Sequence, residues 1–178
     1  MSLLRTVIVV FTLLAPILGA RADTLRDATA AVQRKDYATA LKLIEPLAEA
    51  GDPRAQTQLA TLYYHGQGVN ESDAQAVVWY DRAARQGHLP AQYLLGNMYA
   101  YGHATVPAGY EPMHLAAQWY FEAARKGHAD AQYALGVLFL TGSGVVQSNA
   151  EARKWFTRAA RQGHADARNY LRGSTGAR

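Results

Sequence analysis

Hydrophobic and polar positions follow the period of an α-helix along most of this chain. Apolar residues recur at intervals of three and four residues through "AQTQLATLYYHG", "AQYLLGNMYAYG" and "AQYALGVLFLTG". The same spacing runs through the segments that follow them, "DAQAVVWYDRAARQG", "HLAAQWYFEAARKG" and "NAEARKWFTRAARQG". The pattern predicts an all-α protein whose helices come in pairs.

A short motif at the end of each pair shows that the pair is a repeated unit. "AARQGH" occurs at residues 83–88 and 159–164, and "AARKGH" occurs at 123–128. Counted from Gly51, the motif glycines are spaced by 36, 40 and 36 residues, close to the roughly 34 residues of a tetratricopeptide unit. We therefore predict a right-handed α-solenoid of antiparallel helix pairs with about four units. The solenoid spans 23–172, with units at about 24–51, 52–87, 88–127 and 128–163, a closing helix at 164–172 and a disordered tail at 173–178.

Residues that begin and end helices stand where the repeat requires them. Ser72 with Gln75, and Ser148 with Glu151, have the spacing of a capping box. The pair "DP" at 52–53 places a capping carboxylate before a proline at the first helical position. In "AARQGH" we expect the alanines to let helices approach, the arginine and glutamine to face water, and the glycine to end the helix. Positive φ is therefore expected at the motif glycines Gly87, Gly127 and Gly163.

Large and small residues at fixed repeat positions predict the core. Trp79, Trp119 and Trp155 share one register, and we expect Trp119 to be buried between units. Gly96 and Gly136 lie inside predicted helices, where glycine costs about 1 kcal/mol relative to alanine. We expect them to let the facing helix, with its paired alanines, pack closely.

The first 22 residues have the pattern of a secretory signal. One arginine, Arg5, precedes an apolar run at 6–18, and "ARAD" supplies the small residues of a cleavage site. The run is shorter than the roughly 20 residues of a membrane span and contains Pro16. We expect cleavage before Asp23 and no stable membrane insertion afterwards, with an uncleaved anchor as the alternative.

Charge and cysteine content narrow the possible environments and partners. The whole chain carries 18 basic and 14 acidic residues, so removal of Arg5 and Arg21 leaves 16 against 14, or +2. This excess is too small to indicate nucleic-acid binding. Basic residues gather after residue 151, where they could meet an anionic surface, although solvated helix faces are the simpler interpretation. With no cysteine, an exported chain folds without disulfides, which suits a bacterial periplasm.

The repeat resembles a known family. "AQYALGVLFLTGSGV" followed by "AEARKWFTRAARQGHADA" is similar to the Sel-one-like repeat, a relative of the tetratricopeptide repeat. The resemblance covers about residues 36–171 and implies a solenoid that mediates protein–protein interaction. Ala60 departs from the pattern, since Gly96 and Gly136 occupy its position, and so does an insertion within residues 102–114.

The sequence offers little evidence for catalysis, metal binding or a cofactor. His88, His128 and His164 occupy one position in successive units, so they lie roughly 8–10 Å apart or more, too far to share one ion. We interpret them as turn histidines that bond to nearby backbone. The glycine loops "GQGV" and "TGSGV" lack the lysine of a phosphate-binding loop, so we interpret them as turns. We predict no catalytic residue, no metal site and no cofactor.

The first helix of each unit lines the concave groove in arrays of this kind. Tyrosine and asparagine give contact area and adaptable hydrogen bonds there, although Tyr93 and Tyr133 could instead pack between units. Carried over by register, and with Tyr110 added from the insertion, the candidate partner-binding residues are Thr57, Thr61, Tyr64, Tyr93, Asn97, Tyr101, Tyr110, Tyr133, Val137 and Leu140.

These features predict an exported, periplasmic scaffold or adaptor that holds another protein or peptide in its groove. A glycan-binding envelope or polysaccharide assembly factor is the first alternative, because the same tyrosines could stack on sugars. A hydrolase is the second alternative, since some cysteine-rich relatives have been credited with that activity.

Overall fold

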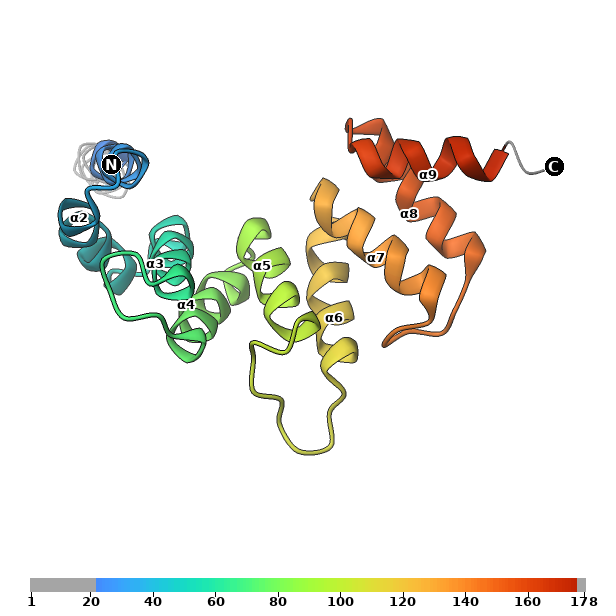
Figure 1. Ribbon diagram of the computed structural model, residues 1–178, viewed down its shortest axis with the longest axis horizontal. Coiled ribbons are helices and arrows are strands. Elements are labelled where there is room, and N and C mark those ends of the chain that lie inside the picture. The colour runs from blue at the N-terminus through green and yellow to red at the C-terminus, as the bar shows by residue number, and fades with distance from the viewer. Residues whose placement is uncertain (1–21, 176–178) are drawn as a thin grey trace, which may run out of the picture.

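The computed structural model describes residues 22–175, which form an arc of helices lying side by side (Figure 1). Within that range there is no β-strand. The helices are a segment at 22–33, α2 (Tyr37–Glu49), α3 (Pro53–His65), α4 (Asp73–Arg85), α5 (Leu89–Ala100), α6 (Pro112–Arg125), α7 (Ala129–Thr141), α8 (Asn149–Arg161) and α9 (Ala165–Thr175). The all-α class and the repeated helix pairs are confirmed.

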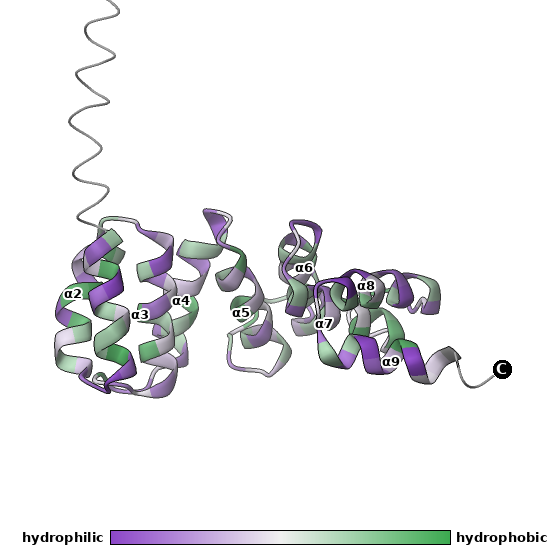
Figure 2. Ribbon diagram, turned by 90° about the horizontal axis from the view of Figure 1, so that it is seen from above, coloured by the Kyte–Doolittle hydropathy of each residue, from purple (hydrophilic) through white to green (hydrophobic). Residues whose placement is uncertain are grey.

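The helices pack in sequence order, each against its neighbours. The closest packing joins α3 to α4, α5 to α6 and α7 to α8, and these pairs are the predicted units. The second helix of each unit then packs on the first helix of the next. Both hydrophobic and hydrophilic residues occur on each helix (Figure 2), and the buried residues form separate clusters along the arc. This division of the core is typical of repeat proteins, where stability comes from neighbouring units.

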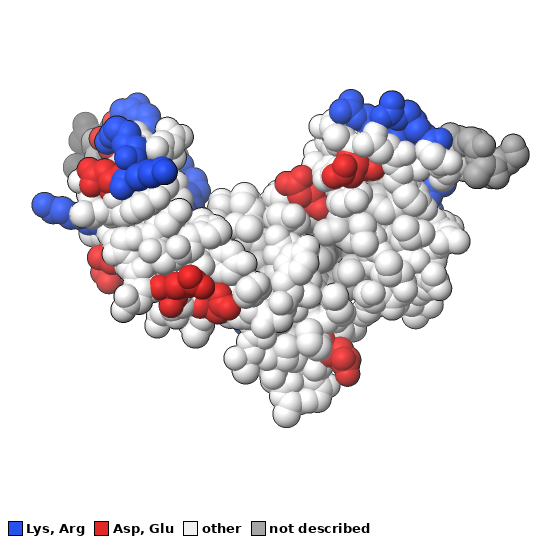
Figure 3. Space-filling model, viewed as in Figure 1, with Lys and Arg blue, Asp and Glu red and all other residues white. Residues whose placement is uncertain are grey.

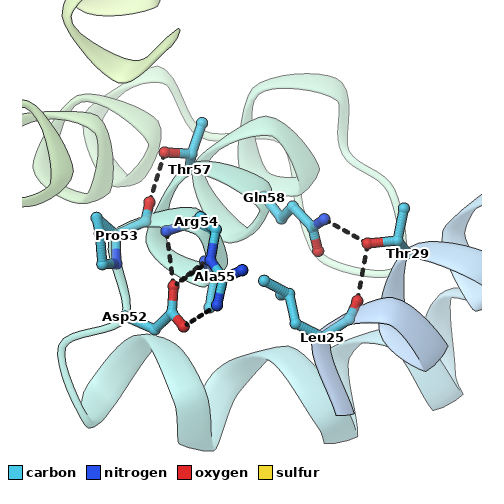
Figure 4. Close-up of polar contacts among 8 residues, drawn as sticks. All are labelled: Leu25, Thr29, Asp52, Pro53, Arg54, Ala55, Thr57 and Gln58. Carbon is cyan, nitrogen blue, oxygen red and sulfur yellow. Dashed lines mark hydrogen bonds and ion pairs between the residues drawn. The ribbon is translucent and has the colours of Figure 1, made fainter. Parts of the chain in front are cut away.

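Polar contacts fix the helix starts and join the N-terminal helix to the array. Asp52 accepts hydrogen bonds from the backbone nitrogens of Arg54 and Ala55, at 2.8 and 3.3 Å, as the predicted cap of α3 (Figure 4). In the same view the amide of Gln58 donates to Thr29 Oγ1 at 2.6 Å. Since Thr29 lies in the helix at 22–33, this bond ties that helix to α3.

The capping serines make only half of the predicted capping box. Ser72 accepts from the backbone nitrogen of Gln75 at 3.2 Å, and Ser148 accepts from that of Glu151 at 3.2 Å. The backbone nitrogen of Ser72 donates to the carbonyl of Tyr63 at 2.9 Å, and that of Ser148 donates to the carbonyl of Phe139 at 2.8 Å. The return bond from the third helical residue is therefore not made, because the preceding helix already satisfies each donor.

The helix ends predicted from the sequence are confirmed at the motif glycines, but the predicted end of the last helix is too early. Gly87, Gly127 and Gly163 have φ of 84°, 101° and 95°, so their predicted positive φ is confirmed. The predicted tail at 173–178 is wrong for residues 173–175, because α9 continues to Thr175. Ser174 Oγ supports this last turn by donating to the Leu171 carbonyl at 3.0 Å. Residues 176–178, like the predicted signal at 1–21, lie outside the described residues.

The buried ring of α6 is Tyr120 rather than Trp119. Tyr120 is 3% exposed, whereas Trp119 is only partly buried and packs at the edge of the cluster around Leu95. A Cβ added to Gly96 would lie 2.6 Å from the Tyr120 ring, and one added to Gly136 would lie 2.7 Å from the ring of Phe156. The helical glycines therefore make room for a ring of the paired helix, which corrects the expectation that the paired alanines face them.

Buried glutamines tie consecutive units together, a feature that the sequence reading missed. Their side-chain amides donate, each at 3.0 Å, to backbone carbonyls at the end of the preceding unit. Gln86 then donates to Gln56 Oε1, and Gln162 to Gln132 Oε1, both at 2.8 Å. The glutamine of "AARQGH" is exposed, as expected, but its amide bonds to the previous unit. The bonds to the carbonyls run from Gln56 to Ala48, from Gln92 to Ala84 and from Gln132 to Ala124.

The middle unit lacks this second bond, because Lys126 occupies the position of Gln86 and Gln162. Gln92 Oε1 is buried and has no hydrogen-bond partner among the described residues. We expect Lys126→Gln to supply the missing donor and to raise the free energy of unfolding by about 1 kcal/mol. Urea melts followed by circular dichroism measure this change. Lys126→Ala is the control, since it removes the lysine without adding a donor, and an equal gain in both variants would contradict the explanation.

Candidate functional site

A hollow of about 430 Å³ lies between α5, α6 and α7. It brings together half of the predicted partner-binding residues, namely Tyr93, Asn97, Tyr101, Tyr133 and Val137. Residues that the sequence reading did not select complete its lining: Ala100, Met113, Tyr120, Ala134, Leu138, Thr141 and Ser143. Its volume lies within the range of roughly 300–1,000 Å³ that is usual for ligand pockets.

Thr57 and Thr61 of the first full unit lie on α3, outside this hollow, and their hydroxyls are bonded within the array. Thr57 is buried, and its hydroxyl donates to the Pro53 carbonyl at 2.7 Å (Figure 4). It also lies 2.8 Å from His88 Nδ1. Thr61 Oγ1 lies 2.9 Å from the hydroxyl of Tyr80. These threonines support the array rather than offering free contacts.

Tyr64, Tyr110 and Leu140 also lie apart from the hollow. Tyr64 contacts His103, and Leu140 packs against the core cluster around Phe156. Tyr110, 56% exposed, lines a shallower depression beside the loop that follows α7. The predicted residues therefore share one repeat register, but only half of them line the same hollow.

The insertion between α5 and α6 is held at its start by His103. His103 Nδ1 lies 2.9 Å from Asp73 Oδ2 at the start of α4, and its Nε2 lies 3.3 Å from the Tyr64 hydroxyl. The backbone nitrogens of His103 and Ala104 both donate to the carbonyl of Met98. The insertion thus folds back on the preceding unit, and its far end leads into α6, where Met113 reaches the rim of the hollow.

Two tyrosines of the hollow pack against other rings. Tyr93 stacks on His128 with ring centroids 5.1 Å apart, and Tyr120 lies at 5.9 Å. Tyr133 stacks on His164 at 4.4 Å. Both alternatives for these tyrosines therefore apply, since the rings pack between units and also line the hollow.

The repeated histidines stand immediately before the first residues of α5, α7 and α9. His128 Nδ1 accepts from the backbone nitrogen of Ala131 at 3.3 Å, and His164 Nδ1 accepts from that of Ala167 at 3.4 Å. The predicted bonding to nearby backbone is confirmed for these two. His88 differs, because its Nδ1 contacts the Thr57 side chain and it makes no side-chain cap bond.

The cap made by His128 predicts a dependence of stability on pH. Burial lowers the pKa of the His128 imidazole below its ordinary value, partly opposed by the Asp130 carboxylate. A lowered pKa in the folded state means that stability is complete above the unfolded pKa of about 6.5 and is lost as pH falls below it. Protonation of Nδ1 would also remove the bond from Ala131. We expect the melting temperature to fall between about pH 7.5 and about pH 5.5.

The matched variant for this pH effect is His128→Asn, since asparagine is a good helix cap that does not titrate here. The pH slope of the melting temperature should be smaller in this variant than in the wild type. Some slope should remain, because burial also lowers the pKa of His88. Identical slopes in wild type and variant, measured by calorimetry, would show that His128 is not responsible.

Asn97 is held by the buried tyrosine of the same unit. The hydroxyl of Tyr120 donates to Asn97 Oδ1 at 2.7 Å. The equivalent pair in the preceding unit is Thr61 with Tyr80. In the following unit both positions are apolar, with Val137 on α7 and a phenylalanine on α8. The two positions are therefore polar together or apolar together in each unit. This pattern in the sequence could have predicted the contact.

The glycine loops and the charged residues give no evidence of a further site. The loop glycines adopt positive φ, as the interpretation of these loops as turns requires. Across residues 22–175 no group of three or more His, Asp and Glu side chains is placed to hold a metal ion. No helix in this range is long and apolar enough to cross a membrane. In the two loops of this kind, the glycines with positive φ are Gly66, Gly68, Gly142 and Gly144.

Basic side chains gather at the C-terminal end of the arc over α9, and another group lies at the opposite end (Figure 3). Several cations of α8 have partners. Lys154 pairs with Glu151 at 2.6 Å, and the Arg158 guanidinium lies 4.5 Å from the centroid of the Trp155 ring. Arg82 on α4 lies over Trp79 in the same way, at 4.4 Å. Between the two ends, the face seen in Figure 3 over α5 and α6 is largely uncharged.

The fold and the hollow define a helical-repeat scaffold with an open concave site. The model of the Sel1 repeat matches residues 29–52, 53–88, 89–128 and 129–164. The chain therefore belongs to the Sel1 repeat family, and the resemblance seen in the sequence is confirmed. Sel1 repeat proteins generally mediate protein–protein interaction and are typically non-enzymatic.

Solved structures of bacterial proteins share this fold. A Sel1 repeat protein from Oxalobacter formigenes is 32% identical over 82% of this chain, with a TM-score of 0.72. A protective antigen of uropathogenic Escherichia coli is 40% identical over 69% of this chain, with a TM-score of 0.63. The chain spans only 56% and 26% of these two proteins. Cysteine-rich protein B of Helicobacter pylori is 22% identical, with 82% of this chain and 96% of that one covered, and shares the fold at a TM-score of 0.54.

Proposed function

We propose that this chain is an exported, non-enzymatic binding scaffold, and that the hollow between α5, α6 and α7 holds a segment of another protein. The observation that carries the proposal is the meeting of Tyr93, Asn97, Tyr101 and Tyr133 in one hollow of ligand size on a fold whose family mediates protein–protein interaction. Tyrosine is enriched at such interfaces because it combines a large apolar ring with a polar end.

Ring contacts favour a protein over a glycan as the occupant. Stacking on a sugar requires an open ring face. Tyr93 stacks on His128 and contacts Tyr120, and Tyr133 stacks on His164 and contacts Phe156, so each ring already uses a face within the array. Tyr101, at 74% exposure, is the ring of the hollow that is open to solvent. One open ring offers less for a glycan than the sequence alone suggested.

Photo-crosslinking in cells tests this function. A benzoylphenylalanine in place of Tyr101 stands at the rim of the hollow, and the same residue in place of Val78 on α4 is the control. Val78 is 43% exposed and does not line the hollow. We expect a discrete protein adduct from position 101 and none from 78. Equal adducts at both positions, or no protein adduct at 101, would contradict the proposal.

Export is the second part of the proposal and rests on the signal pattern of the first 22 residues. The exported chain should then begin at Asp23 and be recovered from a bacterial periplasm. Intact mass of the purified protein measures this. A protein that keeps residues 1–22 and fractionates with membranes would show an anchor instead. The basic end over α9 could meet an anionic surface in that compartment, and this contact is separate from the hollow.

A further inference from the structure

In the two middle units, a carboxylate neutralises the arginine at the end of the second helix. On α4, Asp81 Oδ2 lies 2.6 Å from Nε of Arg85. On α6, Glu122 Oε2 lies 2.7 Å from Nη2 of Arg125. The two arginines occupy the same position in the repeat. Basic and acidic residues are equal in number on each of these helices, so neither carries a net charge.

The last unit departs from this pattern on α8. Arg161 stands at the position of those arginines, but Thr157 and Arg158 replace the two carboxylates. Two further cations, Arg153 and Lys154, stand where the middle units have valine, alanine or glutamine. Apart from Lys154, no cation of α8 forms an ion pair with a carboxylate of residues 22–175. With four cations and one acid, α8 carries a net charge of +3.

Charge is divided unevenly along the described chain as a whole. Residues 22–148 hold nine basic and twelve acidic side chains, a net charge of −3. Residues 149–175 hold six basic and two acidic ones, a net charge of +4. These six cations line two depressions at the C-terminal end of the arc (Figure 3). The basic end surface, as we call it, consists of Arg153, Lys154, Arg158, Arg161, Arg168 and Arg172.

Two arginines of this surface are held in place and still have N–H groups to donate. The guanidinium of Arg158 lies over the ring of Trp155, an arrangement that leaves the edge of its planar fork uncovered. Arg153 donates from Nη1 to Ser174 Oγ at 3.2 Å, which uses one of its five N–H donors. Because these contacts restrict the side chains before a ligand arrives, less entropy is lost on binding.

The lining of the depression on α8 defines the chemistry of its ligand. The depression has a volume of about 480 Å³ and is lined by four cations, Thr157 and Ala150. An apolar ligand would find no apolar side chain larger than alanine there. Arginine binds phosphate through paired N–H donors, and these charge-assisted bonds are stronger than those to neutral groups. Phosphate groups therefore match this lining.

The extent of the basic end surface favours many phosphates side by side over one. From Arg153 to Arg161, α8 alone covers about 12 Å along its axis, and α9 adds two more cations. One phosphate ion would contact only some of these groups. A lipid bilayer presents a plane of headgroups that meets all of them, and basic residues are attracted to such an anionic surface.

We infer that the basic end surface binds the headgroups of anionic phospholipids and holds the chain against a membrane surface without insertion. The inference rests on the export part of the proposed function, because export places the chain beside a membrane and away from nucleic acid. The hollow shares no lining residue with the two basic depressions. A docked chain therefore keeps its hollow available for a protein partner.

Binding of the purified exported protein to lipid vesicles tests this inference. One set of vesicles contains phosphatidylcholine alone, and the other contains phosphatidylcholine with an equal amount of phosphatidylglycerol. We expect the protein to sediment with the anionic vesicles in about 0.1 M salt and to be released in about 1 M salt, where screening is much stronger. It should stay in solution with the neutral vesicles.

The matched variants are Arg158→Glu on α8 and Arg82→Glu on α4. The two arginines share one repeat position, and each lies over a tryptophan ring, at 4.5 and 4.4 Å. Glutamate already occupies this position on α6. Each basic residue at an anionic surface contributes about fivefold to affinity. We therefore expect Arg158→Glu to bind the anionic vesicles roughly tenfold or more weakly and Arg82→Glu to bind within about twofold of the wild type.

A fluorescent label locates the contact, because the chain has no cysteine and a single introduced one is labelled alone. A nitrobenzoxadiazole label on Thr157→Cys stands in the basic depression, and the same label on Val78→Cys stands on the exposed surface of α4. Anionic vesicles should shift the emission of the first label to shorter wavelength and leave that of the second unchanged.

Four results would overturn the inference. They are no binding of the wild type to anionic vesicles in about 0.1 M salt, unchanged binding by Arg158→Glu, equal losses in both glutamate variants, and an equal emission shift at both labels. Displacement from the vesicles by duplex DNA or polyglutamate at the same concentration of negative charge would assign the surface to another class of partner, and would also overturn it.

The vesicle experiment fails or succeeds independently of the hollow. If the chain does not bind vesicles but gives a protein adduct at Tyr101, the membrane inference is wrong and the proposed function of the hollow stands. If the chain binds anionic vesicles through α8 but gives no adduct at that position, the reverse holds.

Discussion

Tyr120→Ala is expected to lower the free energy of unfolding by about 3–5 kcal/mol, the usual cost of removing a buried aromatic ring. The ring lies where Gly96 leaves space for it, and alanine would leave a cavity between α5 and α6. The hydrogen bond to Asn97 would be lost as well. The same change at Trp119, which is only partly buried, should cost about 1–2 kcal/mol. Urea unfolding followed by circular dichroism measures both values.

Tyr120→Phe separates the ring from its hydroxyl. The phenyl ring still fills the space beside Gly96, so only the bond to Asn97 is removed, at a cost of about 1 kcal/mol. The expected order of destabilisation is therefore Tyr120→Ala, then Trp119→Ala, then Tyr120→Phe. If Trp119→Ala destabilises the chain as much as Tyr120→Ala, the tryptophan carries more of the core than its exposure indicates.

Gly144→Ala is the second change with a large expected effect. Gly144 has φ of +70°, where an L side chain costs about 1–2 kcal/mol. A Cβ there would also lie 2.3 Å from the backbone carbonyl of Met113 and 2.7 Å from the backbone nitrogen of His114. Since backbone atoms at the start of α6 cannot move aside like a flexible side chain, the loop after α7 must shift. We expect a total loss of about 3 kcal/mol or more.

Gly127 provides the control for Gly144, because it has the conformational cost without the clash. Its φ is +101°, and a Cβ would meet nothing within 4 Å. Gly127→Ala and Gly127→Val should each cost roughly 1–3 kcal/mol through backbone strain alone. Thermal and urea melts of the three variants compare the two effects. Equal losses at 144 and 127 would show that the clash is relieved cheaply, and an unchanged Gly127→Val would contradict the positive φ.

Local features of the fold were readable from the sequence because they depend on residues close together in the chain. The three- and four-residue spacing gave the helices, and the repeated glycines gave the unit length. Caps such as Asp52, and the positive φ of Gly87, are set within one helical turn. The family followed from the same repeated pattern.

Contacts between helices were predicted less accurately. The helical period does not determine which of two adjacent side chains faces the neighbouring helix. Trp119 and Tyr120 are such a pair, and the space beside Gly96 on α5 decides that the tyrosine is buried. The sequence reading also placed Gly96 opposite alanines, since it lacked the rotation of α6. The bonds between glutamine side chains were missed for the same reason, because Gln86 and Gln56 lie 30 residues apart.

Register selected the candidate site residues, but only the tertiary structure decided which of them are available. Thr57 and Asn97 both lie on the first helix of a unit. The hydroxyl of Thr57 is buried and bonded within the array, whereas the amide of Asn97 keeps its donors open to a hollow formed by three helices. Periodicity determines the face on which a residue lies. The neighbouring units determine whether its hydrogen-bonding groups are already satisfied, because those partners come from other helices.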